Sequence, residues 1–207
     1  MIVPARRRLL MLIALPFLLA ACAGGEWETN YGDVVDPQEA RNWRVVEVDV
    51  QVPETLTVSE ANTYAPDADI VWRGDPPGNR YAQVDAIVTT GLRRGAAGLK
   101  GRRPVRLIAT VTEFHALTEK TRRTLGNAGV HNISFTAQVV DARTGKPLTP
   151  PDHIKADLVA YSGARAIEAE REGLTQKVRI TNHLARVIAG WLGTGPDVRG
   201  TFRRSGR

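Results

Sequence analysis

The sequence has a single cysteine, Cys22, which excludes a disulfide within the chain and any metal site built from several cysteines. It also lacks a stretch of about 20 consecutive apolar residues, the length that a membrane-spanning helix needs. The apolar run from Leu9 to Leu19 is shorter and contains Pro16. No acidic residue precedes Cys22, whereas three arginines, residues 6–8, stand immediately before that run. The first 22 residues therefore differ in character from the rest of the chain.

The order of charged, apolar and small residues in this segment is typical of an export signal. The last four residues, Leu19-Ala20-Ala21-Cys22, match the lipobox of bacterial lipoproteins, whose cysteine receives a diacylglyceryl group before cleavage on its amino side. We predict a signal peptide over residues 1–21, cleavage between Ala21 and Cys22, and lipidation of Cys22 with acyl chains such as palmitate. A cleaved signal without lipid, or an uncleaved anchor, would also fit, but the position of the only cysteine favours the lipoprotein. Ala23 is not an aspartate, which by resemblance to enterobacterial sorting favours the outer membrane.

Hydrophobic residues make up 43% and charged residues 24% of the chain, as in ordinary globular proteins. We expect a lipidated N-terminus and tether over residues 22–42, because this segment has no apolar period. A single α+β domain over 43–195 and a disordered basic tail over 196–207 follow. The formal charge of +6 falls to about +3 without the three signal arginines. An exported protein does not meet nucleic acid, so the expected partners are a membrane and an envelope protein.

Alternating apolar residues predict strands, and apolar residues at steps of three and four predict helices. The segment 119–129 is polar and basic and indicates a mobile hairpin tip. Residues 164–172 either extend the last helix or form an irregular approach to it. Gly91, Gly95 and Gly98 indicate close packing of a helix on the sheet. The predicted strands are 46–52, 70–72, 105–117, 133–139 and 154–161, and the predicted helices are 81–99, capped by Asn79, and 174–191.

In outline the order is β-β-α-β-β-β-α. Such runs of strands with two helices favour an α+β fold: a two-layer sandwich of a mostly antiparallel sheet with the two helices packed on one face. Within it, Val46, Val48, Val50 and Val52 are expected to share a buried face of their strand. In the central strand, Val105, Leu107, Ala109 and Val111 should share one face and Phe114 should lie on the other.

Catalysis needs side chains that converge, and no nucleophile with a base, nor spaced metal ligands, stands out. We therefore predict no enzyme activity, no catalytic residue, no metal site and no cofactor. The four histidines are interpreted as surface or capping residues, and the aspartates at 67, 69 and 75 as turn formers. Basic residues at two places are the candidate partner contacts: Arg93 and Arg94 on the long helix, and Arg122 and Arg123 in the expected hairpin tip.

The lipobox, the strand that ends at Pro53, the helix after Asn79, the strands around Thr144-Gly145 and the last helix together resemble small uncharacterised alphaproteobacterial lipoproteins. More remotely they resemble the auxiliary lipoproteins of ABC-type and paraquat-inducible intermembrane transport systems. The resemblance implies a non-enzymatic accessory or assembly component of an envelope complex, which works by binding. The alternative is a periplasmic lipid or small-molecule binding protein, with a hydrophobic pocket between helix 81–99 and the sheet.

Overall fold

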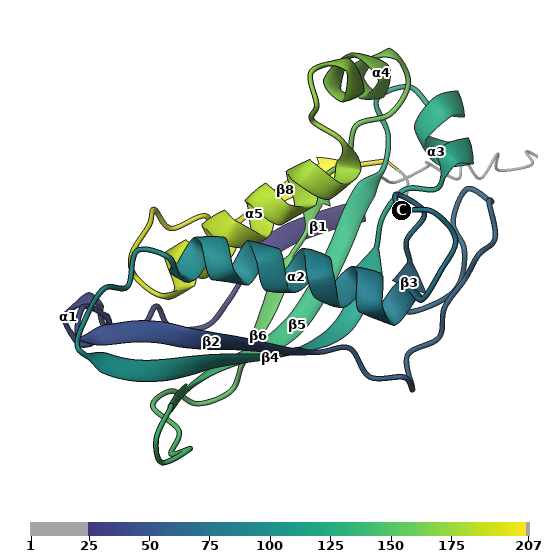
Figure 1. The fold of residues 1–207 in the computed structure, drawn as a ribbon. Coiled ribbons are helices and arrows are strands. Elements are labelled where there is room, and N and C mark those ends of the chain that lie inside the picture. Colours follow the sequence, from purple (N-terminus) through teal and green to yellow (C-terminus); the bar gives the residue numbers. More distant parts are fainter. Residues whose placement is uncertain (1–24, 206–207) are drawn as a thin grey trace, which may run out of the picture.

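The structure is a computed structural model that describes residues 25–205. The predicted cleavage and lipidation at Ala21 and Cys22 lie outside these residues. The elements follow the order β1 (Gly25–Asn30), α1 (Pro37–Ala40), β2 (Trp43–Gln51), β3 (Ile70–Val71), α2 (Arg80–Ala96), β4 (Arg103–His115), α3 (Glu119–Thr124), β5 (Val130–Asp141), β6 (Asp152–Ala156), β7 (Leu158–Val159), α4 (Ala164–Arg171), α5 (Gln176–Trp191) and β8 (Gly200–Arg204) (Figure 1).

The strands form one open sheet in the order β2-β4-β5-β6-β1-β8, in which β3 also pairs with β4 and β7 with β5. The two-residue strands β3 and β7 extend the sheet at the end where β4 finishes and β5 begins. Strands β2 and β3 run parallel to β4, and the other pairs are antiparallel. The sheet is therefore mixed, with β2 at one edge and β8 at the other.

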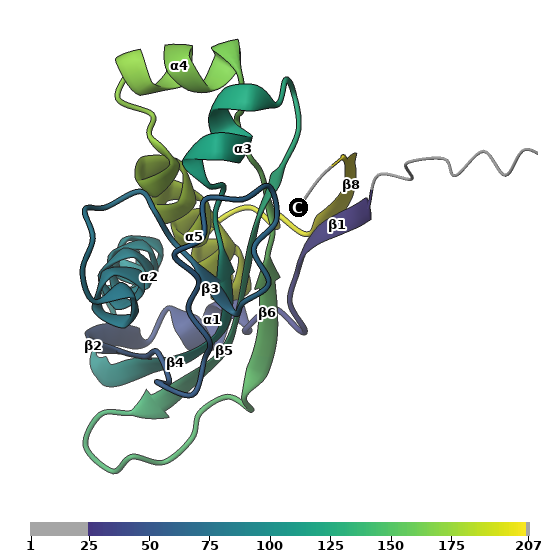
Figure 2. The same cartoon turned by 90° about the vertical axis from the view of Figure 1, so that its right-hand side faces the viewer.

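Helices α2 and α5 lie side by side against one face of the sheet (Figures 1 and 2). Helix α2 begins as the sequence predicts, because the side chain of Asn79 accepts a hydrogen bond from the amide of Ala82. Thr175, which was not predicted as a cap, caps α5 in the same way. Two glycines of α2 allow this helix to pack closely against α5. A Cβ at Gly91 would lie 2.7 Å from the Leu184 Cβ, and one at Gly95 would lie only 2.5 Å from the Ala185 carbonyl oxygen. The expected close packing is thus against α5 rather than against the sheet.

The predicted shared face of the central strand is confirmed over residues 105–111, and the neighbouring strand β5 buries an equivalent face. In β4 and β5 the alternating apolar side chains point toward the helices and are at most 1% exposed: Val105, Leu107, Ala109, Val111, Ile133, Phe135, Ala137 and Val139. Phe114 joins this face, contrary to the prediction, because the β4–β5 register shifts between Val111 and Glu113. A bulge of this kind inserts one residue and so reverses the alternation beyond it.

The α+β class is confirmed, but the predicted element order is wrong in detail. Among residues 25–205 there are five helices rather than two, and α1, α3 and α4 are short. Residues 164–172 neither extend the last helix nor form an irregular approach to it. They contain a separate helix, α4, which ends before Gly173, where the backbone has a positive φ of 77°. None of the helices in this part of the chain has both the length and the apolar composition needed to cross a membrane.

The segment expected to be a tether is folded from residue 25 onward. Tyr31 and Ala40 are buried in the core, and the amide of Val35 donates to the carbonyl of Trp191 over 2.9 Å. Strand β1 and helix α1 have six and four residues, too short to produce a recognisable apolar period. Only the residues before Gly25 could therefore connect the domain to an anchor.

The basic tail expected to be disordered forms strand β8. It pairs along its whole length with β1, from Gly25 opposite Arg204 to Thr29 opposite Gly200. The Arg204 guanidinium also donates to the Asn127 side chain over 2.8 Å and to the Ala160 carbonyl over 3.2 Å. Backbone pairing with a distant strand stabilises a segment whose composition alone indicates disorder.

The expected mobile hairpin tip contains helix α3. The hydroxyl of Thr118 accepts from the amide of Thr121 at the N-terminus of α3, and donates to the carbonyl of Thr63 over 2.7 Å. These contacts join the segment to the loop that precedes β3, and they explain why a polar sequence is ordered here.

Candidate binding groove at the β2 edge

Strand β2 is an edge strand whose backbone pairs with β4 on one side only. Its register shifts between Val45, opposite Val105, and Glu47, opposite Arg106, so that Val46 is the extra residue of a bulge. The side chain of Val46 is consequently 53% exposed, whereas Val48 is buried. The prediction that Val46 shares the buried face is therefore wrong, since the bulge turns it outward.

A groove runs between this bulge and the C-terminal end of α2. It encloses about 360 Å³, and residues of β2 and of the segment 93–100 form its walls. Ala96 and Leu99, both buried, provide apolar surface on the helix side, and Val45 and Val48 provide it on the strand side. The bulge matters because it presents Val46 at the groove as an accessible apolar side chain.

Three basic residues line this groove: Arg44 on β2, Arg93 on α2 and Lys100 after α2. All three are exposed, and within the described residues none of them forms an ion pair. Glu47 is the acidic residue among the groove-lining side chains. We call the groove, lined by Arg44–Val48, Arg93, Ala96, Ala97, Leu99 and Lys100, the edge groove.

The structure separates the four predicted contact residues into two pairs. Arg93 lies in the edge groove, and Arg94 beside it donates to the side chain of Asn182 on α5 over 3.2 Å. Arg122 and Arg123 are on α3, which follows the carboxyl end of β4, whereas the edge groove lies beside the amino end of that strand. Arg122 is half-buried and paired with Glu170 of α4, so of these two only Arg123 is an exposed, unpaired cation.

A second hollow, of about 380 Å³, was not predicted from the sequence. It lies where β1 and β8 leave the rest of the sheet, and it is mainly acidic. Asp157 is buried there and accepts hydrogen bonds from the amide of Glu28 and the side chain of Asn132, while its burial raises the pKa of the carboxyl group. The sequence does contain one signal for this hollow, namely the polar side chains at alternate positions of β5. The lining residues are Glu26, Trp27, Glu28, Glu113, Asn132, Ser134, Lys155, Asp157 and Thr201.

The interpretation of the histidines as surface or capping residues is wrong for three of the four. His115, His131 and His183 are buried, and only His153 is exposed. Neither ring nitrogen of His131 has a hydrogen-bond partner within the described residues, and burial lowers its pKa to about 3. Burial likewise lowers the pKa of His183 to about 4, although its Nε2 lies 3.2 Å from the hydroxyl of Thr29.

Two of the three aspartates interpreted as turn formers, Asp69 and Asp75, have side-chain contacts with other segments of the chain. Asp69 accepts hydrogen bonds from the amide and the hydroxyl of Thr57, each over 2.7 Å. Asp75 accepts from the Trp72 indole and pairs with Lys177 of α5. Within residues 25–205, no group of three histidine, aspartate or glutamate side chains is placed to hold a metal ion.

Two solved structures similar to this chain were compared. One, described as a "putative lipoprotein" from Caulobacter crescentus CB15, is 15% identical with a TM-score of 0.34, and the match covers 76% of this chain and 95% of the other. The other, a PelC dodecamer from Paraburkholderia phytofirmans, is 12% identical with a TM-score of 0.34, over 80% and 97% of the two chains. The resemblance to lipoproteins of intermembrane transport systems finds no support in these matches.

The comparison with curated proteins found no match. A protein-family model does match, over residues 43–207, and it is described as a family of unknown function, DUF6778. This match includes the edge groove, both central strands and the C-terminal strand β8. Because it extends over most of the sequence, the chain belongs to the DUF6778 family.

Proposed function

We propose that this protein is a non-enzymatic lipoprotein of the bacterial cell envelope, and that it acts as an accessory or assembly component by binding a partner protein in the edge groove. It is anchored through Cys22, in the outer membrane and facing the periplasm. The order of residues in the segment 1–22 supports this location.

The partner segment is extended and acidic. An edge strand offers unpaired backbone groups to which another strand can be added, and β2 is such a strand. Next to it, Arg44, Arg93 and Lys100 have no ion-pair partner within the described residues, so carboxylates of a partner would supply the missing charge. These unpaired cations beside an open strand edge are the observation that carries the proposal.

The groove also supports a second candidate, the binding of a small amphiphile with an anionic head group. It lies between α2 and the sheet, where a pocket is expected from the sequence, and it encloses about 360 Å³ between walls that are partly apolar. Small-molecule sites in proteins have volumes of about 300 to 1,000 Å³. A groove of this size would hold one small molecule rather than a whole diacyl lipid.

The test is chemical crosslinking in intact cells, followed by capture of the lipidated protein from solubilised membranes. We expect a reproducible envelope protein with the wild type and its loss with the double variant Arg93→Glu/Lys100→Glu. The matched control is Arg171→Glu/Arg186→Glu, which reverses two exposed charges on α4 and α5, outside the groove, and should retain the partner. Loss of the partner only in the control would contradict the proposed site.

Native mass spectrometry of the purified protein separates the two candidates. A retained small molecule that is lost in Arg93→Glu/Lys100→Glu would favour the amphiphile. A clean protein mass, together with a captured partner, would favour the accessory component.

A further inference from the structure

The folded domain begins very close to the proposed lipid anchor. Gly25, the first residue of β1, is three residues after Cys22. Even a fully extended chain spans at most about 3.6 Å per residue, so the Cα atoms of Cys22 and Gly25 are within about 11 Å of each other. This connection is too short to let the domain turn freely above a membrane.

The strand registers place Gly25 at the opposite end of the sheet from the edge groove. Arg44 of the groove lies opposite Pro104, at the amino end of β4. At the other end of β4, Glu113 pairs with Ser134, which pairs with Lys155, which pairs with Asn30 of β1. From there β1 runs backward past the carboxyl end of β6 to Gly25.

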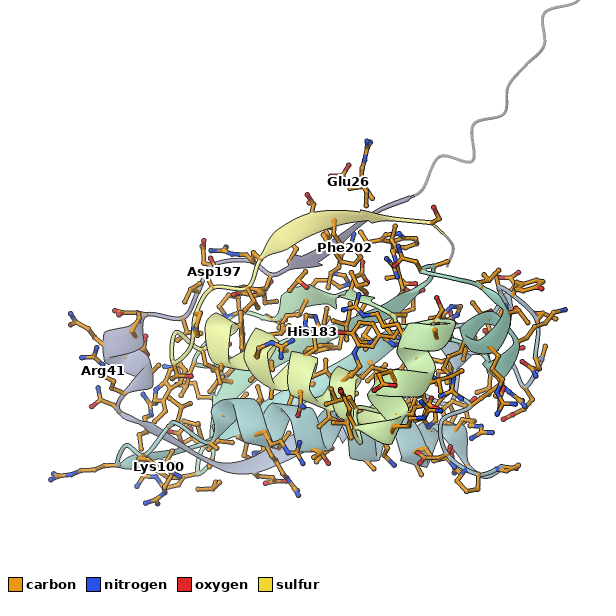
Figure 3. The ribbon with its side chains drawn as sticks, turned by 90° about the horizontal axis from the view of Figure 1, so that it is seen from above. Glu26, Arg41, Lys100, His183, Asp197 and Phe202 are labelled. Carbon is orange, nitrogen blue, oxygen red and sulfur yellow. The ribbon has the colours of Figure 1, made fainter. Side chains whose placement is uncertain are left out.

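The separation between these two ends is large. About seven residues of β4 and five residues of β1 lie between them, and each residue advances a strand by about 3.3 Å, which gives about 40 Å along the strands. Figure 3 shows the two ends through their labelled residues, with Glu26 on β1 far from Lys100 beside the groove. A connection of about 11 Å cannot compensate for a distance of this size.

The end of the molecule that carries Gly25 has side chains suited to a lipid surface. Strands β1 and β8 stand apart from the helices as a two-stranded ribbon (Figure 2), with Trp27 opposite Phe202, both half-buried, and with Arg203 exposed. Arg123 of α3 is also exposed. The chain that follows α3 contacts the end of the ribbon, because the Gly129 amide donates a hydrogen bond to the Ser205 carbonyl. Half-buried aromatic rings and exposed arginines favour the head-group region of a bilayer, and the exposed Glu26, opposite Arg203, offsets only part of this positive charge.

We infer that this ribbon end, formed by β1, β8 and the exposed Arg123, lies on the bilayer that carries the anchor, and that the edge groove projects away from it. The inference rests on the proposed lipidation of Cys22. It deepens the proposed function, because a groove held away from the membrane takes a protein segment from the surrounding space and not the head groups of its own bilayer.

The sole cysteine makes a direct test possible. Once Cys22 is lipidated it has no free thiol, so a cysteine introduced by Arg203→Cys or by Lys100→Cys is the only site for a fluorescent label. Both residues are exposed, so neither change removes a buried contact. The full lipidated protein is labelled and reconstituted into vesicles of phosphatidylethanolamine and phosphatidylglycerol that contain a lipid with a nitroxide in its head group.

We expect the label at position 203 to lose most of its fluorescence through quenching by the nitroxide and the label at position 100 to lose almost none. Equal quenching at both positions would mean that the domain lies flat, and stronger quenching at position 100 would mean the reverse orientation. Either result would overturn the inference. Failure of the proposed lipidation looks different: the wild-type protein would then take up label at Cys22 and would not float with the vesicles.

Discussion

The two edges of the sheet are attached to the same core in different ways. At the β2 edge, Trp43 and Val48 are buried in the apolar cluster beneath α2. At the β8 edge, β1 reaches β6 through a register of only two residues, Thr29 and Asn30, and is otherwise held by polar contacts such as those of Thr29 with Asp157 and His183. One edge therefore depends mainly on burial of apolar surface and the other on hydrogen bonds, which respond to pH and to single polar substitutions.

At constant pH, the largest expected effect is in the apolar half of the molecule, formed by β2, β4, β5, α2 and α5, at the contact between α2 and α5. Gly95→Leu places a side chain where even a Cβ would lie 2.5 Å from the Ala185 carbonyl oxygen. A backbone atom in a packed helix cannot move aside, so we expect the free energy of unfolding to fall by on the order of 3 kcal/mol. Urea denaturation measures the change.

The matched control is Gly98→Ala. A Cβ there meets its nearest atom, of Thr194, only at 3.8 Å, and the change should stay within about 0.5 kcal/mol. Similar losses in both variants would show that α2 and α5 are not held by this close contact.

The next prediction is on pH dependence and concerns two buried histidines, His131 of β5 and His183 of α5. His131 and His183 have folded-state pKa values of about 3 and 4, below the ordinary 6.5. The unfolded chain therefore binds protons first, so stability falls as the pH decreases from about 6.5 toward 4. The slope is about 1.4 kcal/mol per pH unit for each histidine. Asp157, whose pKa is raised, opposes part of this loss.

Urea denaturation between pH 7 and pH 4.5 measures this slope. His131→Leu should reduce it by about half, since one of the two buried imidazoles is gone. His153→Ala, at the exposed histidine, should leave the slope unchanged. A wild-type protein whose stability is constant over this range would contradict the burial of both histidines.

A smaller and local effect is expected when the ribbon loses its polar attachment. Asp157→Ala leaves the amide of Glu28 and the side chain of Asn132 without their acceptor, at a cost of about 1 to 3 kcal/mol. Hydrogen exchange should accelerate at β1 and β8 and remain unchanged at β2. Lys155→Ala, which removes a surface ion pair with Glu28, is the control and should cost less than about 1 kcal/mol. Equal acceleration at both edges would mean that the two halves unfold together.

The smallest effect is expected at the bulge of β2. Val46→Lys changes a side chain that is already 53% exposed, so stability should change by less than about 0.5 kcal/mol. Val48→Ala, two residues further along, removes buried apolar atoms and should cost more, about 1 to 2 kcal/mol. Thermal unfolding of both variants compares them, and a larger loss at Val46 than at Val48 would place the bulge elsewhere.

The apolar half is also the half that could be predicted from the sequence. Strands β4 and β5 and helices α2 and α5 have long apolar periods, which identify both their type and their buried faces. The ribbon could not be predicted, because β1 and β8 are short, polar and separated by most of the chain. Neither strand has a partner nearby in the sequence that would indicate pairing.

The candidate site was predictable only in part. Arg93 stands in a basic cluster that the sequence displays, but the groove beside it depends on a bulge and on the edge position of β2. Both are properties of strand pairing and leave no local pattern. The buried histidines were misjudged for a similar reason, since polar residues next to strands and helices are usually exposed and only the packing shows otherwise.

The pairing of Gly25 with Arg204 has a consequence for how the protein is made. Strand β1 is among the first parts of the fold to be synthesised, yet one of its two neighbours is among the last. Until residues 200–204 are available, β1 presents an open strand edge, which is the kind of surface on which unfinished chains aggregate. A chain truncated just before Gly200 would keep that edge permanently, so premature termination near the end would be more harmful than the loss of a few polar residues suggests.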